Sequence, residues 1–96
     1  MELLKTGAAG TMESGDIYVE VDKGAGGVEI ELQSTVASLY GRRIKEVISE
    51  VLKEQGVSSA RVTANDKGAL DCTIRARVAT ALLRASEQGD SGWWKK

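Results

Sequence analysis

The sequence between residues 36 and 52 reads VASLYGRRIKEVISEVL, and its apolar residues recur at the spacing of an amphipathic helix. Ser34 or Thr35 can cap the N-terminus of this helix through a side-chain oxygen. Gly56 is placed to end the helix with a left-handed residue. The rest of the chain must therefore cover one apolar helical face. The residues expected on that face are Val36, Leu39, Tyr40, Ile44, Val47, Ile48, Val51 and Leu52.

Two runs before this helix alternate apolar and polar residues, which is typical of half-buried β-strands. They are residues 17–22, IYVEVD, and residues 28–33, VEIELQ. The glycine-rich loop at residues 23–27 predicts that the two runs pair as an antiparallel hairpin. The residues expected to face the core are Ile17, Val19, Val21, Val28, Ile30 and Leu32.

The chain after the helix contains one more strand and one more helix. Residues 57–64 alternate again, and Asn65-Asp66 is predicted to end this strand and to cap the next helix. Residues 67–85 have helical periodicity. The apolar stripe expected on this second helix comprises Leu70, Ile74, Val78 and Leu82, with Ala81 and Ala85 beside it.

The order of elements, β-β-α-β-α, predicts an α+β fold. We expect a small, mainly antiparallel sheet of three to four strands with both helices packed on one face. Residues 1–88 suit a single small domain. Residues 89–96 are predicted to form a flexible tail. Its Trp93 and Trp94 are either docking anchors for a larger subunit or part of a tail without a role.

Composition excludes several classes of protein. The chain has 96 residues with 13 basic and 14 acidic side chains, a balance that argues against binding to nucleic acid or to an anionic membrane. No apolar run approaches the roughly 20 residues that span a bilayer, and residues 1–5 lack the apolar stretch of a signal peptide. Cys72 is the only cysteine, so no intramolecular disulfide can form, which favours a cytoplasmic location.

Histidine is absent, which removes Ser-His-Asp and Cys-His catalysis and the commonest zinc ligand. Cys72 has no histidine to activate it, so we expect it to be a small buried apolar residue of the second helix. The glycine-rich loop lacks the spacing of a phosphate-binding motif and is interpreted as a simple hairpin connection. The chain is therefore expected to be non-catalytic and to lend a chemical group to other proteins.

The stretch before the first clear strand is short, polar and turn-prone. Residues 1–9 show no period and are interpreted as a loose lead-in, with partial docking on the fold as the alternative. Residues 11–13 are predicted to form a short strand that turns at Ser14-Gly15 into the next strand. From the pattern alone Ser14 is an ordinary turn serine.

Two segments resemble the acyl carrier protein of citrate lyase, its small gamma subunit. They are AGTMESGD at residues 9–16 and DKGALDCTIRARV at residues 66–78. The length and the spacing of the elements between them also agree, so the resemblance covers nearly the whole chain. In that family the first serine of a Gly-Thr-hydrophobic-Glu-Ser-Ser-Asp motif carries a prosthetic group. The matching residue here is Ser14, and Gly15 stands in place of the second serine.

The resemblance implies a covalent cofactor at Ser14, 2′-(5″-phosphoribosyl)-3′-dephospho-CoA, joined through a phosphodiester. A dedicated prosthetic-group transferase would attach it and would supply the base, so Ser14 needs exposure but no lowered pKa of its own. Gly15 opens space beside the hydroxyl. Glu13 and Asp16 are expected to serve transferase recognition or local turn hydrogen bonds. No metal site is expected.

The resemblance also implies a reaction cycle and partners. The arm would carry acetyl and citryl thioesters between a transferase (alpha) subunit and a lyase (beta) subunit, while citrate is cleaved to acetate and oxaloacetate. Tethering a thioester raises its local concentration at the partner active sites. The acyl group of a related citramalate lyase is an alternative, as is a plain scaffold domain that holds a complex together.

Arg75 and Arg77 flank the apolar stripe of the second helix two positions apart, so they point to different faces. A solvated helix face is the simpler interpretation of both. The alternative is that one of them pairs with a carboxylate of a partner subunit or steadies a phosphate of the arm.

Overall fold

The computed structural model describes residues 1–34 and 37–86. Thr35 and Val36 of the predicted first helix, and the predicted tail with Trp93 and Trp94, lie outside the described residues. The elements, in order, are β1 (Gly7–Ala9), β2 (Ile17–Asp22), β3 (Val28–Ser34), α1 (Ala37–Glu54), β4 (Ala60–Asp66) and α2 (Asp71–Ser86).

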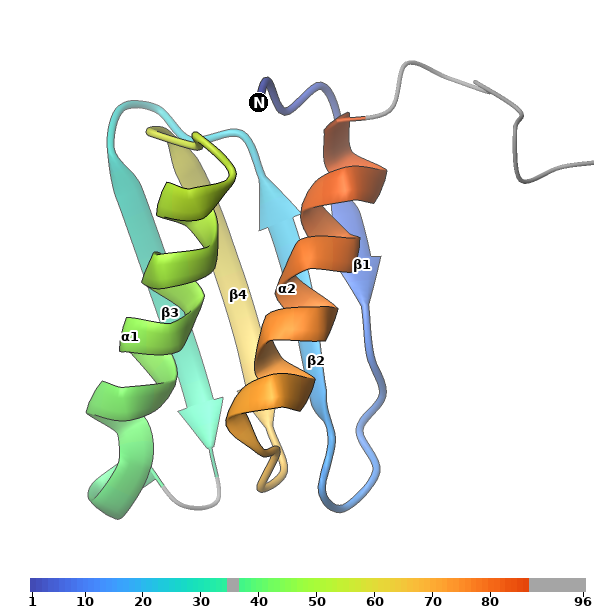
Figure 1. The fold of residues 1–96 in the computed structure, drawn as a ribbon, viewed down its shortest axis with the longest axis vertical. Coiled ribbons are helices and arrows are strands. Elements are labelled where there is room, and N and C mark those ends of the chain that lie inside the picture. The colour runs from blue at the N-terminus through green and yellow to red at the C-terminus, as the bar shows by residue number, and fades with distance from the viewer. Residues whose placement is uncertain (35–36, 87–96) are drawn as a thin grey trace, which may run out of the picture.

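The fold is the predicted α+β class, with four strands in one sheet and both helices on the same face (Figure 1). The strand order is β1-β2-β4-β3. β1 pairs with β2 and β2 with β4 in antiparallel fashion, whereas β3 and β4 are parallel. The prediction of a mainly antiparallel sheet is thus confirmed, and one further strand, β1, precedes the predicted order.

The predicted hairpin between residues 17–22 and 28–33 is wrong. β4 lies between β2 and β3, with Val19 and Leu32 both opposite Ala64. The cause is the helix after β3, because α1 is the crossover that parallel neighbours require. In this central position Ala60, Val62 and Ala64 of β4 face the core and are buried.

The core lies between the sheet and the two helices. The predicted inward faces of β2 and β4 are buried, and so is most of the stripe on both helices. β3 is an edge strand, and Val28 on it is 42% exposed. The buried residues of the two helices are Ile44, Val47, Ile48, Val51, Leu52, Ile74, Val78, Ala81, Leu82 and Ala85.

Besides Val28, four residues that were predicted to be apolar core are exposed instead. Leu39 and Tyr40 are 77% and 56% exposed, and the first turn of α1, which contains them, extends past the end of β3 (Figure 1). Leu70 is 70% exposed because α2 begins at Asp71 rather than at residue 67. Cys72 lies in the first turn of α2, off its buried stripe, and carries an exposed free thiol.

The segment before α2 forms a turn because of Asp66. Its buried carboxylate accepts hydrogen bonds from the Ser34 hydroxyl at 2.9 Å and from the backbone N–H groups of Gly68 and Ala69 at 3.1 and 3.0 Å. β4 accordingly continues through Asp66 instead of ending at residue 64. Gly68 then reverses the chain with a φ of 91°. These bonds delay the start of α2 to Asp71.

The N-terminal residues are docked rather than loose. Gly7–Ala9 form β1, and Leu3 is buried. A Cβ on Gly7 would lie 2.2 Å from the carbonyl oxygen of Ala81, so only glycine permits β1 to approach α2 this closely. Residues 11–13 do not form the predicted strand. β1, at residues 7–9, pairs with β2 in their stead.

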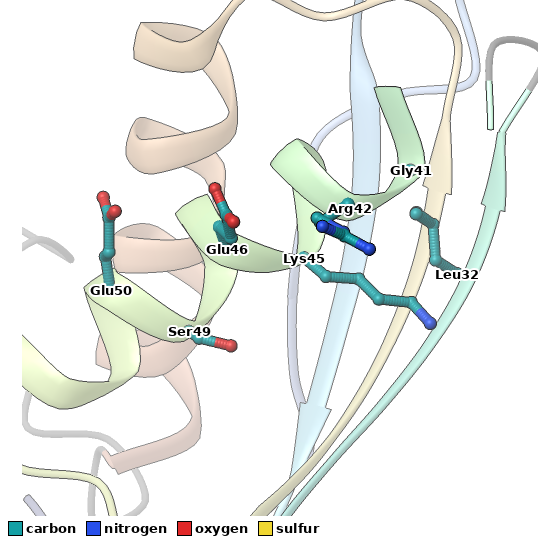
Figure 2. Close-up of a pocket in the computed structure, with 7 residues that line it drawn as sticks. All are labelled: Leu32, Gly41, Arg42, Lys45, Glu46, Ser49 and Glu50. Carbon is teal, nitrogen blue, oxygen red and sulfur yellow. The ribbon is translucent and has the colours of Figure 1, made fainter. Parts of the chain in front are cut away.

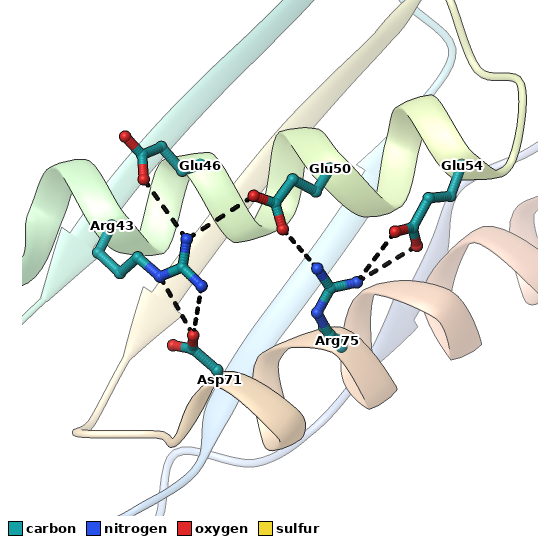
Figure 3. A network of polar contacts seen from close by, with 6 residues as sticks. All are labelled: Arg43, Glu46, Glu50, Glu54, Asp71 and Arg75. Carbon is teal, nitrogen blue, oxygen red and sulfur yellow. Dashed lines mark hydrogen bonds and ion pairs between the residues drawn. The ribbon is translucent and has the colours of Figure 1, made fainter.

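Ion pairs join the exposed sides of α1 and α2 (Figure 3). Arg43 contacts Asp71 at 2.7 Å and Glu50 at 3.7 Å, and Arg75 pairs with Glu50 and Glu54. The hydrogen bond to Asp71 and its charge raise the pKa of Arg43. The Arg75 side chain, 39% exposed, thus lies on a solvated face, as the simpler interpretation predicts, and bridges the two helices there.

Candidate functional site

Ser14 lies on the connection between β1 and β2, at one end of the sheet (Figure 1). The Asp16 backbone N–H donates to the Glu13 carbonyl oxygen at 3.0 Å, which closes a four-residue turn with Ser14 and Gly15 at its centre. Gly15 has a φ of 84°, as the third residue of a type II turn requires. The turn at Ser14-Gly15 is as the sequence predicts, although the strand before it is β1 rather than residues 11–13.

Two glycines shape this connection in different ways. A Cβ on Gly10, whose φ is 101°, would lie 1.8 Å from the Ile17 carbonyl oxygen. The backbone at Gly10 therefore packs directly against the backbone of Ile17. A Cβ on Gly15 would meet no atom within 4 Å. Gly10 therefore closes the base of the loop tightly, whereas the space beside Ser14 is open.

The Ser14 turn is hydrogen-bonded to the connection between β4 and α2. The Gly15 backbone N–H donates to the Lys67 carbonyl oxygen at 2.7 Å, and the Lys67 N–H donates to the Asp16 carbonyl oxygen at 2.9 Å. These two bonds hold the backbone on the C-terminal side of Ser14 against the connection between β4 and α2. The serine is exposed, yet its backbone is anchored on a rigid part of the fold.

Asp16 is the polar centre of the loop. Its carboxylate accepts hydrogen bonds from the Thr11 hydroxyl at 2.7 Å and from the Ile17 N–H at 2.7 Å. Arg77 on α2 donates to both carboxylate oxygens, from Nε at 3.0 Å and from Nη2 at 2.9 Å. The bonds from Arg77, then Thr11, hold the pKa of Asp16 well below its usual range, and Asp16 in turn raises the pKa of Arg77.

The role of Arg77 was missed in the sequence. Its partner Asp16 is 61 positions away, and the spacing of Arg75 and Arg77 indicated only that they point to different faces. That separation of faces is confirmed, because Arg75 pairs with α1 and Arg77 with the Ser14 loop. The expectation that Asp16 makes local turn hydrogen bonds also agrees with its contacts.

Glu13 takes part in the turn through its backbone. Its N–H donates to the Thr11 hydroxyl at 3.2 Å and its carbonyl oxygen accepts from Asp16. The Glu13 side chain is exposed. Among residues 1–34 and 37–86, no group of three or more acidic or cysteine side chains is arranged to hold a metal ion. The loop thus presents the Ser14 hydroxyl group, and the ion pair between Asp16 and Arg77 holds the loop in its shape.

A hollow of about 700 Å³ lies elsewhere, between α1 and the edge strand β3 (Figure 2). Lys45 and Arg42 border it together with Glu46 and Glu50, and Leu32 forms an apolar part of its wall. The charges on its border are mixed, and none of the Ser14 loop contributes to it. It is therefore separate from the candidate site.

Comparison with known proteins identifies the family. The profile of the ACP family, described as malonate decarboxylase delta subunit, matches residues 4–85. The citrate lyase acyl carrier protein of Lactobacillus helveticus is 49% identical over 94% of this chain and 93% of its own length. The chain belongs to the citrate lyase acyl carrier protein family. The family member from Pectobacterium atrosepticum is 42% identical over 99% of both chains.

The fold agrees with that of a chain in a solved structure. A chain in the crystal structure of a Pseudomonas malonate decarboxylase hetero-tetramer in complex with malonate superimposes with a TM-score of 0.67. The match covers 90% of this chain and 93% of that chain at 18% sequence identity. The family expected from residues 9–16 and 66–78 is confirmed by the relatives that are 42–49% identical and by the family profile. In the part of the chain that the structure describes, no helix is long and apolar enough to cross a membrane.

Proposed function

We propose that this chain is the acyl carrier subunit of a citrate lyase complex and that Ser14 carries its prosthetic group. The observation that supports this most is how Ser14 is presented. It is exposed at the centre of a turn, and the backbone beside it is bonded to Lys67 at 2.7 Å. An attachment site needs such an accessible hydroxyl on an anchored backbone.

The surroundings of Ser14 fit 2′-(5″-phosphoribosyl)-3′-dephospho-CoA joined through a phosphodiester. The open space beside Gly15 leaves room for a bulky group. Arg77, 40% exposed, pairs with the Asp16 carboxylate and offsets its negative charge, so that Asp16 repels a phosphate on Ser14 less than an unpaired carboxylate would. Once bound, the group supplies a terminal thiol that carries acyl groups as thioesters.

The residues of this chain have positioning roles in that function. Asp16, fixed by Arg77 and Thr11, holds the turn in one shape for the prosthetic-group transferase. Glu13 and Gly15 provide the exposed surface that this transferase recognises. The transferase supplies the base, because the chain has no histidine and Ser14 has no general base of that kind.

The partners that follow are the transferase (alpha) and lyase (beta) subunits of citrate lyase, in the cytoplasm. The carrier presents acetyl and citryl thioesters to their active sites and takes no part in proton transfer. Tethering places the thioester at an effective concentration in the millimolar range, which is the physical advantage of a carrier over a free thioester.

Activity in an assembled complex tests this function. Protein matured with its prosthetic-group transferase is combined with the alpha and beta subunits, and oxaloacetate formed from citrate is measured. Ser14→Ala should abolish turnover, whereas Ser58→Ala, a change to an exposed serine near the start of β4, should retain it. Full activity of Ser14→Ala would contradict the proposal and favour the scaffold alternative. Turnover of citramalate in place of citrate would favour the related lyase.

A further inference from the structure

A second cavity opens between the first turn of α1 and the start of α2, with a volume of about 330 Å³. We name it the interhelix pocket. Its floor consists of the buried residues Ile44 and Ile74, and Ala69 adds to its wall. Tyr40 and Leu70, which are 56% and 70% exposed, stand at its sides. These two side chains contribute little to the core, so core packing does not account for their apolar character.

The interhelix pocket and the Ser14 turn share one connection. Gly68 and Ala69 line the pocket, and they directly follow Lys67, whose carbonyl oxygen and N–H bond to Gly15 and Asp16. The Asp66 carboxylate fixes Gly68 and Ala69 from beneath. The connection between β4 and α2 therefore lies between the Ser14 turn and the pocket. The start of α1, the start of α2 and the connection between β1 and β2 lie at the same end of the fold (Figure 1).

We propose that the interhelix pocket receives the acetyl-thioester end of the arm on Ser14. This inference rests on the proposed attachment of the arm to Ser14. An acetyl thioester is small, uncharged and largely apolar, which suits a cavity with an isoleucine floor. Because the arm is tethered close by, its effective concentration is on the order of millimolar, and a dissociation constant about tenfold lower is enough to keep the pocket mostly filled.

The charges around the pocket define which acyl group it accepts. Asp71 and the buried Asp66 both contribute to its lining. Arg43, the cation of the lining, is paired with Asp71 at 2.7 Å (Figure 3). A citryl thioester carries two further carboxylates, which these acids repel and which Arg43 cannot neutralise without losing its partner. The pocket therefore shelters the acetyl arm and releases the citryl arm to the lyase subunit.

Thioester reactivity of the matured carrier tests this inference. The arm is acetylated, and its cleavage by hydroxylamine is followed by mass in the wild type, Leu70→Asp and Tyr40→Ala. The matched control is Leu39→Ala, because Leu39 is 77% exposed on α1 next to Tyr40 but does not line the pocket. Backbone amide NMR shifts of Gly68 and Ala69 are recorded for the unmodified and the acetylated forms of each protein.

We expect cleavage to be about 5–10-fold slower in the wild type and in Leu39→Ala than in Leu70→Asp, with Tyr40→Ala between them. This factor corresponds to a dissociation constant roughly tenfold below the effective concentration. The Gly68 and Ala69 amides should shift on acetylation in the wild type and not in Leu70→Asp. Spectra of the unmodified proteins serve as the control that each variant is folded.

Equal cleavage rates together with unchanged amide shifts would overturn the pocket proposal. If the added mass is nevertheless on Ser14, the attachment function stands and only the pocket fails. If no mass is found on Ser14, both fail. A third contrary result is that Leu70→Asp leaves cleavage unchanged but weakens binding of the alpha or beta subunit, because the exposed leucine would then dock a protein.

Discussion

Substitution of alanine for each of the two glycines of the Ser14 loop is expected to lower the free energy of unfolding by very different amounts. Gly10→Ala and Gly15→Ala both place a side chain where φ is positive, at 101° and 84°. A Cβ at Gly10 would be 1.8 Å from the Ile17 carbonyl oxygen, whereas a Cβ at Gly15 has nothing within 4 Å. The pair of variants therefore separates backbone strain from steric overlap.

The expected free energies follow from those contacts. At Gly15 the left-handed conformation costs about 1–2 kcal/mol, and the loss of freedom in the unfolded chain offsets about 0.4–1 kcal/mol of it. Gly15→Ala should thus destabilise the fold by about 1 kcal/mol. At Gly10 backbone strain of about 1–3 kcal/mol is joined by overpacking of about 1–3 kcal/mol, so Gly10→Ala should lose several times more.

Urea unfolding followed by far-ultraviolet circular dichroism measures both variants. The midpoint of Gly10→Ala should fall well below that of Gly15→Ala with an unchanged dependence on urea, as a change of stability alone requires. Equal urea midpoints for the two variants would refute the inference that the Gly10 backbone packs directly against the backbone of Ile17.

Three further predictions concern the loop and the core. The lowered pKa of Asp16 stabilises the fold above the usual aspartate pKa of about 3.9. This stabilisation is lost as pH falls through the pKa of Asp16 in the folded protein. The difference in unfolding free energy between the wild type and Arg77→Gln, measured in urea, should therefore be largest near neutral pH and shrink below about pH 4. A difference that grows on acidification contradicts this. Leu82→Ala should cost about 2–5 kcal/mol by thermal unfolding because Leu82 is fully buried, whereas Leu83→Ala, at a site 48% exposed, should cost far less; similar losses would argue against this packing. Asp66→Ala leaves two backbone N–H groups without their acceptor, at about 1–3 kcal/mol, and hydrogen exchange of those amides should accelerate; unchanged exchange would rule out their bonds to the carboxylate.

Local pattern predicted most elements because burial imposes a period on the sequence. The alternation of residues 17–22 and the stripe from Ile44 to Leu52 each face the core as expected. Pattern could not select the strand partners, because alternation is the same for any neighbour. In the sheet, β4 lies between β2 and β3. This order can be inferred only once α1 is recognised as the crossover between the parallel strands β3 and β4.

The site divides in the same way. Turn chemistry located Ser14-Gly15, and the resemblance of residues 9–16 assigned the serine a role that pattern alone left open. The Asp16–Arg77 pair joins residues 61 positions apart, and no local signal indicates such a contact. Tyr40 and Leu70 were assigned to the core because helical spacing does not reveal where a helix leaves the sheet or where it begins.

The attachment of the prosthetic group to Ser14 is tested most directly by mass spectrometry. Protein produced together with its maturation enzymes is measured intact and then as peptides, for the wild type, Ser14→Ala and Ser58→Ala. We expect the mass of one phosphoribosyl-dephospho-CoA group on the wild type and on Ser58→Ala, located on the peptide that contains Ser14, and none on Ser14→Ala. A wild-type protein without added mass, or a Ser14→Ala protein that still gains it, would contradict the assignment.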